Sequence, residues 1–88
     1  MAKTNNRPVR TVFGERFRDL LKKKGLSVKT VAAAAQMHVS LVYYYINGQR
    51  IPSTASIFRL AKALGVKPAE VFSMVDENDF AVVSENHK

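Results

Sequence analysis

Apolar residues recur at intervals of three and four along most of the chain, which is the spacing of one face of an α-helix. The pattern is interrupted where glycine, proline or a short polar run ends a helix or begins a loop. Glycine closes the runs at positions 25, 48 and 65. The pattern predicts an all-α domain with five helices, over residues 13–24, 28–35, 39–47, 54–64 and 68–75.

The first predicted helix has one apolar stripe and a strongly basic end. Gly25 ends the helix, and the run Lys22–Lys24 lies in its last turn, where the helix dipole favours positive charge. The helix end explains these lysines better than direct contact with phosphates. The apolar stripe consists of Phe13, Phe17, Leu20 and Leu21.

The stretch 27–52 contains two short helices separated by a three-residue break, 36–38. Ser27 is placed to cap the first of them through its hydroxyl. The apolar face of that helix is made of small residues, which allow another helix to cross it closely: Val28, Val31, Ala32 and Ala35. Two short helices joined by such a tight turn are the signature of a helix-turn-helix motif.

The second helix of this pair has two chemically distinct faces. A rotation of about 100° per residue places Val42 and Tyr45 toward the core, with Leu41 and Ile46 at the edges of that face. Tyr45 is therefore predicted to be a core residue. The opposite face points outward and carries Val39, Ser40, Tyr43, Tyr44 and Asn47.

The last two predicted helices have the features of supporting elements. Ser53 or Thr54 caps the fourth helix, and Pro68 suits the first turn of the fifth. The buried face of the fourth helix consists of Ile57, Leu60, Ala61 and Leu64. Beyond residue 75 the helical pattern decays, and a short strand or an apolar patch would include Phe80, Val82 and Val83.

The charge of the chain is unevenly placed. The 88 residues form one domain and have a net charge of +7. Residues 1–24 contain eight lysines and arginines, residues 25–52 contain two and no acidic residue, and the end of the chain is acidic. We therefore divide the chain into a basic arm (1–12), a helical domain (13–75) and an acidic tail (76–88). A basic body of this kind indicates a nucleic acid or another anionic partner.

Composition excludes several other classes. The chain has no cysteine, so it has neither a disulfide framework nor a cysteine-based zinc site, which fits a reducing cytoplasm. Its apolar runs are too short to span a bilayer, and we expect no membrane partner. It lacks a phosphate-binding loop, a nucleophile beside a base and a paired-carboxylate site, so we expect no enzyme activity. His38 and His87 are isolated, and we expect neither a metal nor a cofactor.

Several of these features occur together, in order, in a known family. The span 13–72, about two thirds of the chain, resembles the Cro/repressor-type helix-turn-helix family, also called the xenobiotic response element family. The resemblance rests on three segments and one alanine, which are Lys24-Gly25-Leu26-Ser27, Ala32, Asn47-Gly48 with Arg50 and Pro52-Ser53, and the run from Leu60 to Val66. It implies a five-helix fold without a cofactor that binds double-stranded operator DNA, usually as a homodimer.

The resemblance also implies where DNA would be contacted. The third helix would lie in the major groove, with base contacts from Val39, Ser40, Tyr43 and Tyr44. Phosphate contacts would come from the positions of Val28, Lys29, His38, Asn47 and Arg50. His38 is placed either to cap the third helix or to touch a phosphate. The arm residues Lys3, Arg7 and Arg10 either enter the minor groove or belong to a solvated terminus.

The chain departs from the family pattern at several places. Val28 stands where the family often has a phosphate-contacting glutamine, and Gln36 stands where the turn usually has glycine. A left-handed conformation at Gln36 would cost about 1 kcal/mol. Leu21 and Ile46 replace an Arg–Glu pair common in the family, which suggests that the contact survives as apolar packing.

The C-terminal part of the domain is the candidate homodimer contact. It has more apolar residues than a short terminal helix needs: Val71, Phe72, Val75 and Phe80, with Val82 and Val83 beyond them. The competing interpretation is that Val71 and Phe72 close the core of the monomer. Two other functions remain open: an antitoxin whose acidic tail binds a toxin protein, and a protein-interaction adaptor with the same fold. The basic, acid-free stretch 25–52 argues against the adaptor.

Overall fold

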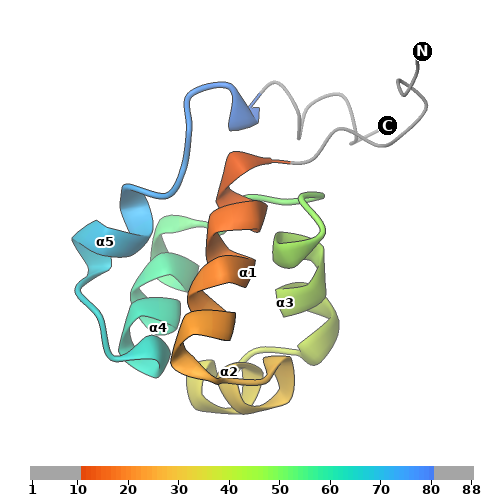
Figure 1. The fold of residues 1–88 in the computed structure, drawn as a ribbon, viewed down its shortest axis with the longest axis vertical. Helices are drawn as coiled ribbons and strands as arrows, with labels where there is room; N and C mark the ends of the chain where they lie inside the picture. Colours follow the sequence, from red (N-terminus) through yellow and green to blue (C-terminus); the bar gives the residue numbers. More distant parts are fainter. Residues whose placement is uncertain (1–10, 81–88) are drawn as a thin grey trace.

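A computed structural model describes residues 11–80, and these residues form five helices and no strand. In the view of Figure 1, α1 lies between α3 and α4, α2 lies across one end of these helices, and α5 lies on the outside. The all-α prediction is confirmed. The bounds are α1 Val12–Lys24, α2 Val28–Ala35, α3 Val39–Ile46, α4 Thr54–Leu64 and α5 Pro68–Phe72.

Most helix ends follow the predicted signals. The hydroxyls of Ser27 and Ser53 accept hydrogen bonds from the backbone N–H groups of Thr30 and Ser56, and so cap α2 and α4. Gly25 and Gly65 end α1 and α4 in the left-handed conformation. Pro68 occupies the first turn of α5, as predicted, but α5 ends at Phe72, so Val75 lies beyond it.

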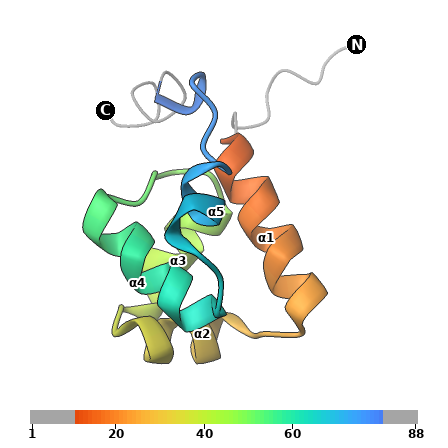
Figure 2. The same ribbon diagram turned by 90° about the vertical axis from the view of Figure 1, so that its left-hand side faces the viewer.

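One hydrophobic core joins the helices. Figure 2 shows α5 lying across the space between α1 and α4. Phe13 and Phe17 of α1 are fully buried, with ring centroids 5.4 Å apart. Leu21 is buried and Ile46 packs against the same core, as apolar packing in place of an ion pair predicts. The other buried apolar residues are Val31, Ala32, Ala35, Val42, Tyr45, Ile57, Leu60, Ala61, Leu64 and Val71.

The start of α1 differs from the prediction. α1 begins at Val12, one residue before the predicted start, and Thr11 is its fully buried cap residue. The Thr11 hydroxyl accepts a hydrogen bond from Gly14, at 2.9 Å. The backbone N–H groups of Val12 and Phe13 donate to the carboxylate of Asp79, at 2.7 and 3.0 Å. The first N–H groups of α1 are therefore satisfied partly from the other end of the described chain.

Residues 76–80 are not a separate acidic tail, because Asp79 is 1% exposed and belongs to the folded domain. A second contact holds the residues just before this segment against α1. The Arg16 guanidinium donates to the backbone carbonyls of Ser73 and Met74 at 3.3 and 3.4 Å. The division predicted at residue 75 therefore falls inside the folded unit. The Asp79 carboxylate lies at the N-terminus of α1, where the helix dipole favours negative charge.

Gly14 permits a close contact between α1 and α3. A Cβ atom at this position would lie 2.7 Å from the backbone oxygen of Tyr45 and 2.9 Å from that of Ile46. These distances are shorter than a carbon–oxygen contact allows, so only glycine lets the first turn of α1 reach the last turn of α3. Gly14 thereby sets the position of α3 relative to the rest of the domain.

Candidate nucleic-acid interface

The connection between α2 and α3 is a tight turn with one left-handed residue. Gln36 has φ 56° and ψ 48°, which is the conformation expected of the glycine usual at this position. The backbone N–H of Met37 donates to Ala32, at 2.9 Å, and that of Gln36 donates to Ala33, at 3.2 Å. These bonds close the end of α2 and offset part of the conformational cost at Gln36.

The inner face of α3 is anchored in the core as predicted. Val42 is fully buried and Tyr45 is 3% exposed. The ring of Tyr45 meets Phe13 edge-on, with centroids 6.4 Å apart. The core assignment of Tyr45 is confirmed. Because Tyr45 and Val42 fix the rotation of α3, they also determine which side chains face outward.

The outer face of α3 presents two phenol rings to solvent. Tyr43 is 49% exposed and Tyr44 is 40% exposed, as the helical rotation predicts. Ser40 is exposed and Val39 is half-buried at the edge of the core. The structure therefore brings the four predicted base-contacting residues onto one helix, with three of them fully on its outer side.

The start of α3 combines His38 and Ser40. His38 is the cap residue of α3, but its side chain makes no capping hydrogen bond, so the capping role considered for it is wrong. Instead its Nδ1 lies 3.2 Å from the Ser40 hydroxyl oxygen. Both side chains are exposed, and this bond holds them beside each other at the helix start.

A cation–aromatic pair joins Tyr44, near the end of α3, to Arg50 in the loop that follows. α3 ends at Ile46, followed by Asn47 and then Gly48 with φ 78°. The guanidinium carbon of Arg50 lies 4.8 Å from the centre of the Tyr44 ring. Two residues predicted for different DNA contacts, one for bases and one for phosphates, are therefore in contact with each other.

The two residues predicted for phosphate contacts at the start of α2 differ in exposure. Lys29 is exposed, whereas Val28 is half-buried against the core. The Val28 side chain has no hydrogen-bond donor, so only its backbone N–H is suited to a phosphate. The arm residues Lys3, Arg7 and Arg10, and His87 near the other end, lie outside the described residues 11–80.

The predicted dimer contact is only partly exposed. Val71 is fully buried, so its place in the dimer contact is wrong and it closes the core of the monomer instead. Phe72 is 42% exposed, Phe80 is 65% exposed and Val75 is half-buried. Val82 and Val83 lie outside the described residues.

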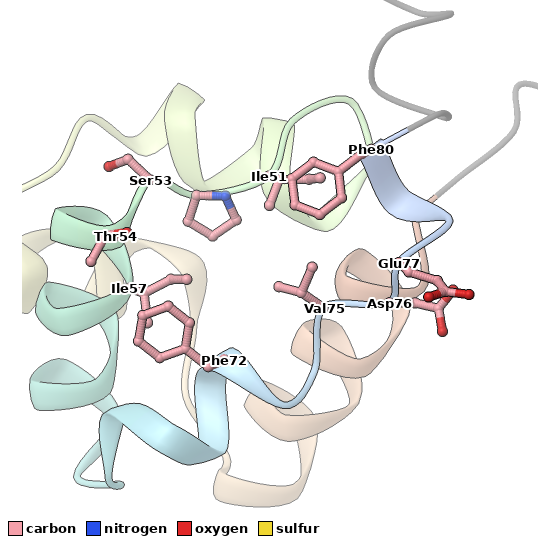
Figure 3. A pocket seen from close by; sticks show the side chains of 10 residues that line it. Ile51, Ser53, Thr54, Ile57, Phe72, Val75, Asp76, Glu77 and Phe80 are labelled. Carbon is pink, nitrogen blue, oxygen red and sulfur yellow. The ribbon is translucent and has the colours of Figure 1, made fainter.

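These exposed side chains belong to an apolar groove between the start of α4 and the segment after α5 (Figure 3). Phe72, Val75 and Phe80 line it from one side, and Ile51 and Ile57 line it from the other. Phe58, beside this groove on α4, is 53% exposed and meets Phe72 edge-on at 6.1 Å between ring centroids.

Sequence reasoning missed three residues that shape these surfaces. A glycine inside the first helical pattern and a phenylalanine beside the buried stripe of α4 were the available signals for Gly14 and Phe58. No local pattern marked Asp79. Within residues 11–80, no three histidines or acidic residues cluster as metal ligands, and no helix there has the length and apolarity to cross a membrane.

This architecture and its sequence are similar to those of known helix-turn-helix proteins. Residues 17–71 match the helix-turn-helix family. The chain is 31% identical over 72 residues to the uncharacterized HTH-type transcriptional regulator y4dJ of Sinorhizobium fredii, covering 82% of this chain and 94% of that one. These two similarities span the α2–α3 pair and the core around it.

Two solved structures have a similar fold. The restriction-modification controller protein C.AhdI from Aeromonas hydrophila superposes with a TM-score of 0.66 and 40% identity, covering 70% of this chain and 94% of that one. The clp gene regulator ClgR from C. glutamicum gives a TM-score of 0.66 at 22% identity, covering 77% and 90%, which shows a shared fold. This chain belongs to the Cro/repressor-type helix-turn-helix family of DNA-binding transcriptional regulators.

Proposed function

We propose that the protein is a repressor that binds a palindromic operator as a homodimer, with α3 in the major groove of each half-site. The observation that carries this proposal is the division of α3 into a buried inner face and an exposed outer face of polar side chains. An anchored helix with exposed polar side chains is what groove recognition requires.

Base contacts come from the first two turns of α3. Val39 offers methyl groups to a thymine, Ser40 offers a hydroxyl that pairs with several bases, and Tyr43 offers a long polar edge. None of these is a bidentate side chain such as Arg, Asn or Gln. Each half-site therefore receives modest discrimination, and specificity against a genome requires two copies.

Phosphate contacts come from both sides of α3. Lys29 at the start of α2 and His38 before α3 flank one side, and Asn47 and Arg50 follow the other. The arm residues Lys3, Arg7 and Arg10 add positive charge from outside the described domain. Neutralising about five to nine phosphates gives a slope of log affinity against log salt of roughly −4 to −8.

The dimer contact is the apolar face formed by Phe58, Phe72, Val75 and Phe80. Exposed aromatic side chains gathered on one surface favour protein–protein contact. This face belongs to α4, α5 and the following segment, and α3 is not part of it. In a two-fold pair that binds a palindromic operator, the two copies of α3 must lie about 34 Å apart, one turn of DNA.

Selection of bound sites from random duplexes tests the whole proposal. The expected result is an inverted repeat with half-site centres about one helical turn apart, and two protein copies per site by sedimentation. A single asymmetric site occupied by one copy would contradict the dimer. Binding without a salt-dependent slope would contradict the electrostatic part.

Phe80→Glu tests the dimer surface separately. The side chain is largely exposed, so the substitution should leave a folded monomer while placing a charge in the contact. The matched control is Glu77→Gln, an exposed position on the same segment after α5 at the edge of the groove shown in Figure 3. A Phe80→Glu protein that still sediments as a dimer would move the contact elsewhere.

A further inference from the structure

Tyr44 and Arg50 form a cation–aromatic pair although both residues are exposed to solvent. Tyr44 lies on α3, while Arg50 lies in the loop that follows. The backbone on both sides of Arg50 is anchored. Before it, the N–H of Gln49 donates to the Tyr44 carbonyl at 2.9 Å, and after it Pro52 is buried. The loop is therefore folded back onto the end of α3 and holds the arginine above the ring.

We propose that Tyr44 is a positioning residue, whose ring orients the guanidinium of Arg50 for a contact with the DNA backbone. This inference rests on the proposed function and gives Tyr44 a role different from the base contact predicted for it. The guanidinium carbon lies 4.8 Å from the ring centre, within the range of a cation–π interaction.

The geometry of a guanidinium allows both contacts at once. The group is planar: its face stacks on an aromatic ring, and its N–H groups point outward from its edge. An edge that remains free can donate two parallel hydrogen bonds to one phosphate. Stacking on Tyr44 and binding to a phosphate therefore do not compete.

The phosphate is favoured over a base because of where Arg50 lies along the chain. Residues at the start of a recognition helix reach the base edges, whereas Arg50 follows the end of α3. Holding a long, flexible side chain in place before DNA arrives reduces the conformational entropy lost on binding. An aromatic ring at position 44 thus strengthens the contact between Arg50 and the phosphate without touching the phosphate itself.

A double-mutant cycle tests this role. The variants are Tyr44→Phe, Tyr44→Leu, Arg50→Gln and Tyr44→Leu with Arg50→Gln. Binding is measured on a random-sequence duplex and on the site selected from random duplexes, at several salt concentrations. Tyr44→Leu should weaken binding about two- to fivefold on both duplexes, which is the range of an exposed cation–π pair. Tyr44→Phe should bind like the wild type because it keeps the ring.

Arg50→Gln should lower the magnitude of the salt slope by about 1, as loss of one phosphate contact does. In that background Tyr44→Leu should have no further effect. The matched control is Tyr43→Leu, because Tyr43 is an exposed neighbour on α3 that is not stacked on Arg50. Its effect should be the same with and without Arg50→Gln.

Several results would overturn the inference. Independent losses for Tyr44→Leu and Arg50→Gln would show that Tyr44 meets DNA by itself, as would a selective loss on the selected site. A loss for Tyr44→Phe equal to that for Tyr44→Leu would assign the effect to the hydroxyl. A wild-type protein that binds neither duplex would overturn the proposed function and this inference together. NMR adds a readout in the free protein: the Arg50 side-chain protons should carry a ring-current shift that Tyr44→Leu removes and Tyr44→Phe keeps.

Discussion

Two regions of the molecule depend on capped helix ends: the α2–α3 pair, and the junction where the two ends of the described chain meet. In the two regions, the residues that share a capping hydrogen bond lie at very different distances along the chain. The cap of α2 joins Ser27 to Thr30, three residues apart. At the junction, Asp79 accepts from Val12 and Phe13, which are 67 and 66 residues away. The first region can form its caps locally, whereas the second forms them only after the chain has folded.

The two regions also have different tasks. The α2–α3 pair exposes the outer side chains of α3, to which the proposed function assigns the contact with DNA. The junction buries a carboxylate that accepts hydrogen bonds from the start of α1, the helix that closely approaches the end of α3. Substitutions at the junction should therefore affect stability first, and substitutions on α3 should affect binding first.

The largest expected effect comes from breaking the junction. Asp79→Ala removes the acceptor of two buried or part-buried α1 N–H groups and should lower the free energy of unfolding by about 2–4 kcal/mol. Asp76→Ala is the control, because the Asp76 carboxylate accepts only a local bond from the Asn78 N–H. It should cost less than about 1 kcal/mol. Urea unfolding measures both, and equal losses would contradict the special role of Asp79.

Substitution of Gly14 should affect both the junction and the α2–α3 pair, because Gly14 lies where α1 meets α3. Adding a methyl group at an unconstrained helix position stabilises by about 0.5–1 kcal/mol. Gly14→Ala should instead destabilise by about 1–3 kcal/mol, because the new Cβ meets the last turn of α3. DNA affinity should fall as well, since α3 must shift. Thermal unfolding and a binding titration check the two parts, and a stabilised variant would refute the close contact.

A third test asks whether binding can change while the junction does not. Deleting residues 1–10 removes Lys3, Arg7 and Arg10 but leaves the Thr11 cap. We expect the magnitude of the salt slope to fall by up to about 3, with unfolding unchanged. Replacing the three cations by serine in the full chain separates charge from length. Unaltered affinity in both proteins would support the solvated-terminus interpretation.

The smallest expected effect lies inside the α2–α3 pair. Gln36→Gly removes the strain of a left-handed residue, worth about 1 kcal/mol, but makes the unfolded chain more flexible. The net gain in unfolding free energy should be less than about 1 kcal/mol. Gln36→Ala keeps the Cβ atom and should show no gain. Differential scanning calorimetry distinguishes them, and a loss of stability for glycine would mean that the Gln36 side chain contributes more than its strain costs.

Much of the fold was predictable because its signals are local. The caps at Ser27 and Ser53 and the stops at Gly25 and Gly65 each depend on neighbours a few residues away. The rotation of α3 followed from the spacing of Val42 and Tyr45. The end of α5 was less predictable, because Val75 continues the apolar pattern after the helix has stopped.

The candidate site was predictable in its residues but not in their mutual contacts. The outward placement of Tyr43 and Tyr44 follows from helical periodicity. The stacking of Arg50 on Tyr44 requires the loop after Gly48 to turn back, and no periodic pattern specifies that. The burial of Val71 likewise depends on how α5 crosses the other helices.

The sequence by itself determined the five helices of residues 11–80, the family and the exposed face of α3, because the caps, stops and periodic faces on which they rest each depend on residues close together along the chain. Only the tertiary structure decided the role of Asp79 as a cap, the requirement for glycine at position 14 and the division of the C-terminal apolar residues between core and surface. These depend on contacts between distant segments. The geometry of such contacts is set by how whole helices pack, and a local pattern carries no record of it.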